Sequence, residues 1–114
     1  MDAAPQLEGM WLGYGTEYLD DQTITINADG HGEYYSDKAG KGFKGKVRID
    51  DKILSIGTHR FKILVQPTVV DTATDFASRQ FYQAHPSTAN PLMMMRLQDP
   101  LLWGRTWITF FKMQ

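Results

Sequence analysis

The 114-residue sequence contains no cysteine, has a net charge of only −1 and holds no long apolar run. The missing thiols exclude disulfide frameworks, cysteine nucleophiles and cysteine-ligated zinc or iron–sulfur sites. The near-zero charge argues against a general nucleic-acid binder, whose surface is usually strongly basic. No apolar stretch reaches the roughly 18 residues of a membrane span, and no signal peptide is recognisable. We therefore expect a soluble protein that contacts no nucleic acid. It would be cytoplasmic, or exported with its signal already removed.

Length and composition predict a single β-rich domain. Domains typically hold about 100–150 residues. Ten glycines and five prolines stand among many β-branched and aromatic residues, which is typical of short strands joined by tight turns. We expect residues 1–6 to be a disordered N-terminal segment and residues 7–114 to form the domain.

Eight segments resemble short β-strands. Gln22–Ala28 alternates polar and apolar residues with the period of a half-buried strand, and Asp29-Gly30 after it is a strong hairpin signal. Close, even spacing of such strands predicts an antiparallel meander, and closing it into an eight-stranded up-and-down barrel removes both unpaired edges. The other predicted strands are Leu7–Tyr14, His31–Ser36, Phe43–Asp50, Lys52–Ile56, Arg60–Gln66, Leu92–Gln98 and Arg105–Met113.

The 25 residues Pro67–Pro91 are too long for a plain hairpin connection. Thr72 to Asp75 fits a capping box, and apolar residues then recur at helical spacing as far as Ala84, before His85-Pro86. We predict a short helix at about 72–84, with a strand over Phe76–Ala84 as the alternative. Such a segment is either a lid or binding loop, or a helix that plugs one end of the barrel.

The first strand resembles that of the lipocalins. Its Gly9-Met10-Trp11 is similar to the G-x-W signature of lipocalins and the wider calycin group, which includes fatty-acid-binding proteins and avidins. The runs TITINADGHGEYY and KGKVRID also look like small bacterial lipocalin-like domains of unassigned function. The resemblance implies that Trp11 closes one barrel end against a basic residue of the last strand, for which Arg105 and Lys112 are the candidates.

Charge is segregated along the chain. Residues 1–37 contain eight acids and no Lys or Arg, whereas residues 38–62 hold eight of the twelve basic residues. Either the acidic and basic strands lie side by side and neutralise each other, or the basic segment forms a patch that captures an anionic ligand or partner.

No pattern of residues predicts catalysis or a metal. His31, His59 and His85 are dispersed in or next to turns, and Asp20-Asp21 and Asp50-Asp51 are typical of solvated turns. The glycines and lysines of residues 40–46 could form an anion-binding nest, but they lead into a strand, which favours an ordinary hairpin turn. We therefore expect no enzyme, no cofactor and no metal site.

The C-terminal strands are apolar on both faces. Met93–Met95 and Ile108–Phe111 place apolar side chains toward the barrel and away from it, because consecutive strand residues point in opposite directions. Either the segment at residues 67–91 covers the outer face, or a homodimer forms there.

An eight-stranded barrel either fills with side chains or holds one small ligand. The leading hypothesis is non-catalytic binding of a small apolar or amphipathic molecule inside the barrel. The alternative is a protein-interaction or inhibitor domain with a solid core that acts through its outer surface. Gly9, Trp11 and Arg105 would close the barrel, and the predicted lining is Ile24, Ile26, Tyr34, Val47, Ile63, Met94 and Ile108.

Overall fold

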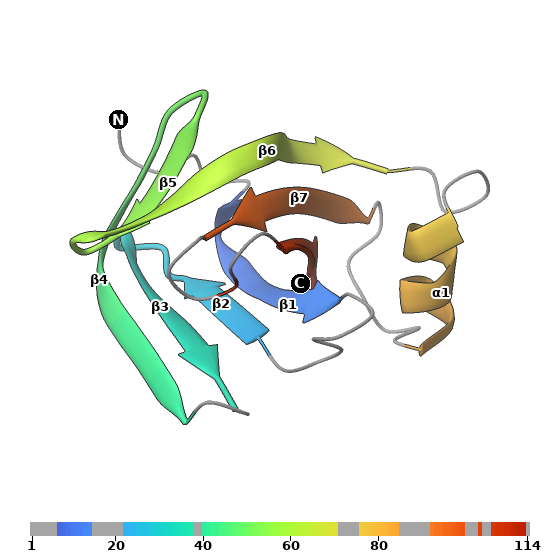
Figure 1. The fold of residues 1–114 in the computed structure, drawn as a ribbon, viewed down its shortest axis with the longest axis horizontal. Helices are drawn as coiled ribbons and strands as arrows, with labels where there is room; N and C mark the ends of the chain where they lie inside the picture. The colour runs from blue at the N-terminus through green and yellow to red at the C-terminus, as the bar shows by residue number, and fades with distance from the viewer. Residues whose placement is uncertain are drawn as a thin grey trace.

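The chain folds into a closed antiparallel β-barrel with a helix at its side (Figure 1). The structure is a computed structural model that describes residues 7–14, 22–37, 40–70, 76–84, 92–99, 103 and 106–113. Within these residues the elements are β1 (Gly9–Tyr14), β2 (Gln22–Ile26), β3 (His31–Ser36), β4 (Lys41–Ile49), β5 (Ile53–Ile56), β6 (His59–Val69), α1 (Phe76–Ala84), β7 (Met93–Gln98) and β8 (Trp107–Lys112).

Every strand pairs with its neighbour in sequence, and β1 pairs with β8 to close the barrel. The closing ladder is antiparallel, with Leu12 opposite Phe111 and Tyr14 opposite Thr109. Tight turns join the short strands: Gly30 follows Asp29 with a φ of 88°, a value that favours glycine. The predicted eight-stranded up-and-down barrel is confirmed.

The interior of the barrel is filled by large side chains. Trp11, Phe61 and Phe110 are all 0% exposed. Glycines also allow segments of the backbone to approach one another closely. A Cβ on Gly45, for example, would lie 2.5 Å from the Cα of Gly57, so the backbones of β4 and the β5–β6 turn approach each other too closely for any side chain. The other buried members of this core are Leu7, Ile24, Ile26, Tyr34, Val47, Leu54, Ile56, Ile63, Met95, Leu97, Trp103 and Ile108.

The sixth strand is longer than predicted. We expected it to end at Gln66, but β6 continues through Pro67 to Val69. Its register against β7 shifts between Ile63 and Val65 and again between Val65 and Thr68. Proline is tolerated in a strand at such irregularities because no ladder hydrogen bond is required from it there.

Residues 76–84 form a helix, as predicted, and not the alternative strand. Its Phe81 is fully buried against the outer face of the barrel, where it stacks on Phe111 at 4.5 Å between ring centroids and meets Tyr14 edge-on at 5.4 Å. The outer apolar face of β8 and β1 is therefore covered by the segment before β7, which was one of the two predicted arrangements.

Met94 points away from the barrel interior, contrary to prediction. It belongs to the outer cluster with Phe81, Leu92 and Phe111, whereas Met95 belongs to the main core. Three consecutive methionines leave the strand phase ambiguous. Arg96 resolves it, because residues two apart share one face of a strand and a charged side chain avoids a packed interior.

Candidate binding surfaces

The barrel interior contains six of the seven residues predicted to line a ligand cavity. Their side chains are at most 9% exposed, and three of them are completely buried. A void that admitted even a water molecule would expose part of its wall, so no such void adjoins the three side chains that are 0% exposed. A ligand in this part of the barrel would have to displace a side chain. The six are Ile24, Ile26, Tyr34, Val47, Ile63 and Ile108.

A polar cluster lies where β2 begins and β3 ends. Tyr34 donates a hydrogen bond from its hydroxyl to Oε1 of Gln22, and Gln22 donates from Nε2 to the Ser36 hydroxyl at 3.3 Å. The indole Nε1 of Trp103 lies 3.4 Å from both Gln22 Oε1 and the Tyr34 hydroxyl oxygen. Trp103 is 5% exposed and stacks on Phe61 at 5.5 Å, so its ring fills this end of the barrel interior.

A buried carboxylate lies at the same end of the barrel. Asp99, which follows β7, is 1% exposed, and its Oδ2 is hydrogen-bonded to Nε2 of His59 at the start of β6. The His59 ring stacks on Phe43 at 4.3 Å. The sequence placed His59 in or next to a turn, and it gave no reason to single out Asp99. The aromatic contacts and the carboxylate account for this histidine structurally.

Trp11 lies on β1 and belongs to the main core. It is fully buried, and its indole Nε1 donates a 2.9 Å hydrogen bond to the carbonyl oxygen of Leu7. Gly9 has a φ of 132°, which favours glycine. Lys112 is directly opposite Trp11 on β8, whereas Arg105 lies outside the described residues.

The apolar outer face keeps some exposed side chains beyond the cover of α1. Trp107 is 53% exposed at the start of β8, where the guanidinium of Arg96 lies 5.7 Å from its ring centroid. Met10 is 41% exposed and adjoins the opposite end of β8, since its carbonyl oxygen accepts a hydrogen bond from Met113 N. Exposed apolar groups are thus separated along the strand by the helix-covered cluster.

Basic side chains gather on the outer surface of β4 and β6. Lys44 is opposite Glu33 of β3, as the neutralising arrangement predicts. Farther along β4, however, Arg48 is opposite Ser55, and Ser55 is in turn opposite Arg60 of β6. In the registers that the structure describes, the residue opposite both arginines is therefore uncharged. The basic face, as we call it, consists of the exposed Lys44, Lys46, Arg48, Arg60 and Lys62.

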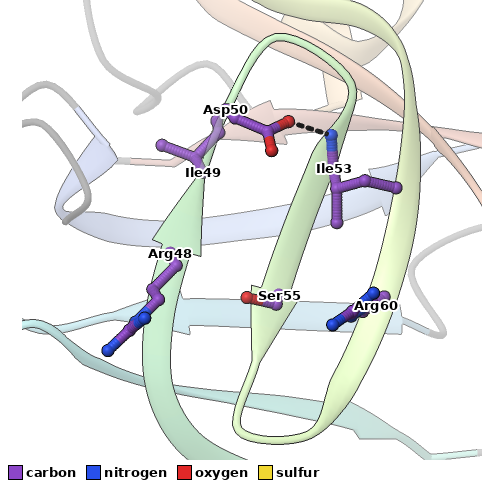
Figure 2. A pocket seen from close by; sticks show the side chains of 6 residues that line it. All are labelled: Arg48, Ile49, Asp50, Ile53, Ser55 and Arg60. Carbon is purple, nitrogen blue, oxygen red and sulfur yellow. Dashed lines mark hydrogen bonds between the residues drawn. The ribbon is translucent and has the colours of Figure 1, made fainter. Parts of the chain in front are cut away.

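A pocket of about 250 Å³ opens on this basic face (Figure 2). Arg48 and Arg60 lie on either side of it, with Ser55 between them. Within the described residues neither arginine forms an ion pair. Ile49, Asp50 and Ile53 complete its wall.

Asp50 is the one carboxylate in the pocket wall, and it is already hydrogen-bonded. Its Oδ1 accepts hydrogen bonds from the backbone N–H groups of Lys52 and Ile53, each at 2.8 Å. These two bonds hold the pKa of Asp50 below its usual 3.8. Asp50 is therefore ionised at neutral pH, and its charge is partly satisfied by the turn that it caps.

The pocket was not identified from the sequence. The alternation of Phe43–Asp50 correctly placed Lys44, Lys46 and Arg48 on one face, but the register that brings Arg48 and Arg60 to the same row depends on the β5 turns. At residues 40–46 the turn residue Gly40 is followed by β4, which is the hairpin turn that the sequence favoured over an anion-binding nest. Asp20, Asp21 and His85 lie outside the described residues.

No protein-family model, curated protein or solved structure matches the chain. Among the residues that the structure describes, no helix is long and apolar enough to cross a membrane. The same residues contain no group of three or more His, Cys, Asp or Glu side chains that could hold a metal ion. The closed antiparallel barrel is consistent with a lipocalin-like fold.

Proposed function

We propose that the protein is a non-catalytic binding module that holds an acidic segment of a partner protein against its basic face. The observation that carries this proposal is the pair Arg48 and Arg60, two exposed guanidinium groups in one row that lack an ion-pair partner within the described chain. Arginine is enriched at interaction surfaces because its planar fork binds carboxylates in a defined geometry.

The filled interior favours the outer surface over the barrel as the binding region. Residues that would line a cavity, such as Ile24, Val47 and Ile108, are 0% exposed. Binding of a small apolar molecule inside the barrel stays a prediction, and it requires movement of a ring such as that of Trp103. Binding on the basic face requires no rearrangement of the core.

An acidic protein segment suits the charge distribution better than a nucleic acid. The net charge of the whole chain is −1, so a polyanion that extended beyond the basic face would be repelled by the rest of the molecule. A short acidic segment would contact only the basic face. Its binding should weaken at high salt, because exposed charges are screened beyond about 8 Å at physiological ionic strength.

Nuclear magnetic resonance titration with poly-L-glutamate tests this proposal. We expect backbone amide shifts confined to β4–β6 that diminish as salt is added. Lys62→Glu should weaken binding by about threefold, since one exposed charge pair contributes about 0.2–1 kcal/mol. Arg79→Glu on α1 makes the same change in net charge away from the basic face and should have a smaller effect.

Two results would overturn the proposal. One is the absence of saturable shifts on the basic face. The other is tighter binding of a single-stranded oligothymidylate than of poly-L-glutamate at the same salt concentration, which would identify a nucleic-acid surface instead.

A homodimer through the C-terminal apolar strands is a second, weaker proposal. Its support is the exposure of Trp107 and Met10, although α1 covers the surface between their ends of β8. Light scattering over a concentration series tests it, and a monomer at high micromolar concentration would contradict it.

A further inference from the structure

We infer that the pocket between Arg48 and Arg60 receives a single carboxylate group, as an acidic side chain of the bound segment would present it. The inference rests on the proposed function of the basic face and specifies the anchoring contact. Nothing in the rest of the basic face combines two guanidinium groups, a hydroxyl and a defined concave wall.

Register places the three polar groups in one row. Ser55 pairs with Arg48 on one side and with Arg60 on the other, and Figure 2 shows its side chain between the two arginines at the same level of the sheet. Neighbouring strands are about 4.8 Å apart, so the two arginine backbones are separated by about 9.6 Å. In Figure 2 the Arg48 side chain extends away from Ser55, so a bound carboxylate would have to draw its guanidinium back toward the central hydroxyl. A carboxylate offers about four lone-pair sites, enough to accept from both guanidinium groups and from the Ser55 hydroxyl.

The charge of the pocket favours a monoanion. Two arginines and the ionised Asp50 leave one net positive charge, which a single carboxylate would neutralise. A phosphate carries up to two charges at neutral pH and would leave the occupied pocket with a net negative charge. The backbone amides of Lys52 and Ile53 occupy Asp50 Oδ1, so this carboxylate is held at the turn and is not released to pair with an arginine.

The size and apolar wall of the pocket suit a glutamate side chain. The volume of about 250 Å³ is below the roughly 300–1,000 Å³ of pockets that enclose drug-sized ligands. Ile49 and Ile53 are half-buried and line the pocket beside the polar row. The Ile49 side chain packs against the main core, whereas Ile53 shares the outer face of β5 with Ser55. The two methylene groups of a glutamate would lie against Ile53 while its carboxylate contacts the arginines.

The probe for this inference is N-acetyl-L-glutamic acid α-amide, with the neutral glutamine analogue and inorganic phosphate as comparisons. Nuclear magnetic resonance of the arginine Nε–Hε groups and the Ser55 amide would report binding. We expect saturable shifts at Arg48, Arg60 and Ser55 with the glutamate probe and none with the glutamine analogue. Arg48→Gln and Arg60→Gln should each weaken binding by about tenfold, because each removes a charge-assisted contact.

Arg79→Gln is the matched control, since it removes one charge on α1, away from the basic face, and should change affinity for the probe less than twofold. All these side chains are exposed, and thermal unfolding of each variant would verify that the fold is kept. Equal or tighter binding of phosphate would overturn the choice of a carboxylate. Unchanged affinity in both arginine variants would overturn the site.

The two proposals fail in different ways. If poly-L-glutamate binds β4–β6 but the single-carboxylate probe does not bind the pocket, the anchoring contact is wrong and the proposed function stands. If the probe binds but poly-L-glutamate does not, the pocket is a site for small carboxylates and the proposed function falls. If neither binds, both proposals are wrong.

Discussion

Asp50 shows how one side chain can cap a turn and shape a pocket at the same time. Its lowered pKa means that its contribution to stability is fully present above the usual 3.8 and is lost as pH falls through the lower value of the folded state. We expect Asp50→Asn to flatten the dependence of the unfolding free energy on pH in this acidic window. Urea unfolding from about pH 5 to about pH 2 would measure it.

Asp51→Asn is the control, because Asp51 is the next residue in the same exposed turn and makes none of these hydrogen bonds. It should leave the pH profile of the parent protein in place. A profile for Asp50→Asn that matches the parent would mean that the turn amides do not depend on an ionised acceptor.

Individual residues differed in how well the sequence predicted them. Trp11 could be placed in the core from its motif and its strand, and it is buried there. Met94 could not be placed by local pattern, because its neighbours are methionines and both faces of β7 are apolar. Asp99 had no local signal at all, since its partner His59 is 40 residues away in the sequence and meets it only when the barrel closes.

At the scale of elements, Phe81 is the largest buried side chain among those that the structure describes on α1. Phe81 is fully buried between Phe111 and Tyr14, whereas the next residue, Tyr82, is 41% exposed. We expect Phe81→Ala to lower the free energy of unfolding by about 3–5 kcal/mol. Tyr82→Ala on the same helix should lower it much less. Equilibrium urea unfolding of both variants would measure the difference.

Loss of Phe81 should also uncover part of the outer apolar cluster. The variant would then self-associate at concentrations where Tyr82→Ala does not, because exposed apolar surface drives association. Sedimentation of the two variants compares them directly. Equal unfolding free energies for Phe81→Ala and Tyr82→Ala would show that α1 contributes little to the stability of the barrel.

Strand existence followed from alternation and turn residues, but strand ends and registers depended on tertiary contacts. The period of Gln22–Ala28 located β2, and Asp29-Gly30 located the turn after it. Pro67 argued for the end of a strand, yet the shifted register between β6 and β7 accommodates it. Arg48, Ser55 and Arg60 lie in one row only because of the register of β4 against β5 and that of β5 against β6. The pattern of a single segment does not predict either register.

For the whole molecule, the decisive property is whether the barrel is hollow or solid. Closure was predictable, because eight short strands leave unpaired edges unless the first and last pair. Filling was not, because Trp103 reaches the interior from the connection between β7 and β8 and not from a predicted strand. The centroid of its ring lies 5.5 Å from that of Phe61 and 6.0 Å from that of Phe110.

Trp103→Ala should convert the solid barrel into a hollow one. We expect a loss of about 3–5 kcal/mol in the free energy of unfolding, because a buried ring is replaced by a cavity. Added indole should restore part of that loss by binding the cavity, whose polar edge keeps Gln22 and Tyr34 as partners for the indole N–H. Trp107→Ala, at a half-exposed position, should show neither effect. Thermal unfolding with and without indole measures both. If indole stabilises the parent protein as much as it stabilises Trp103→Ala, the barrel already admits a ligand. Binding inside the barrel would then explain the function better than binding on the outer surface.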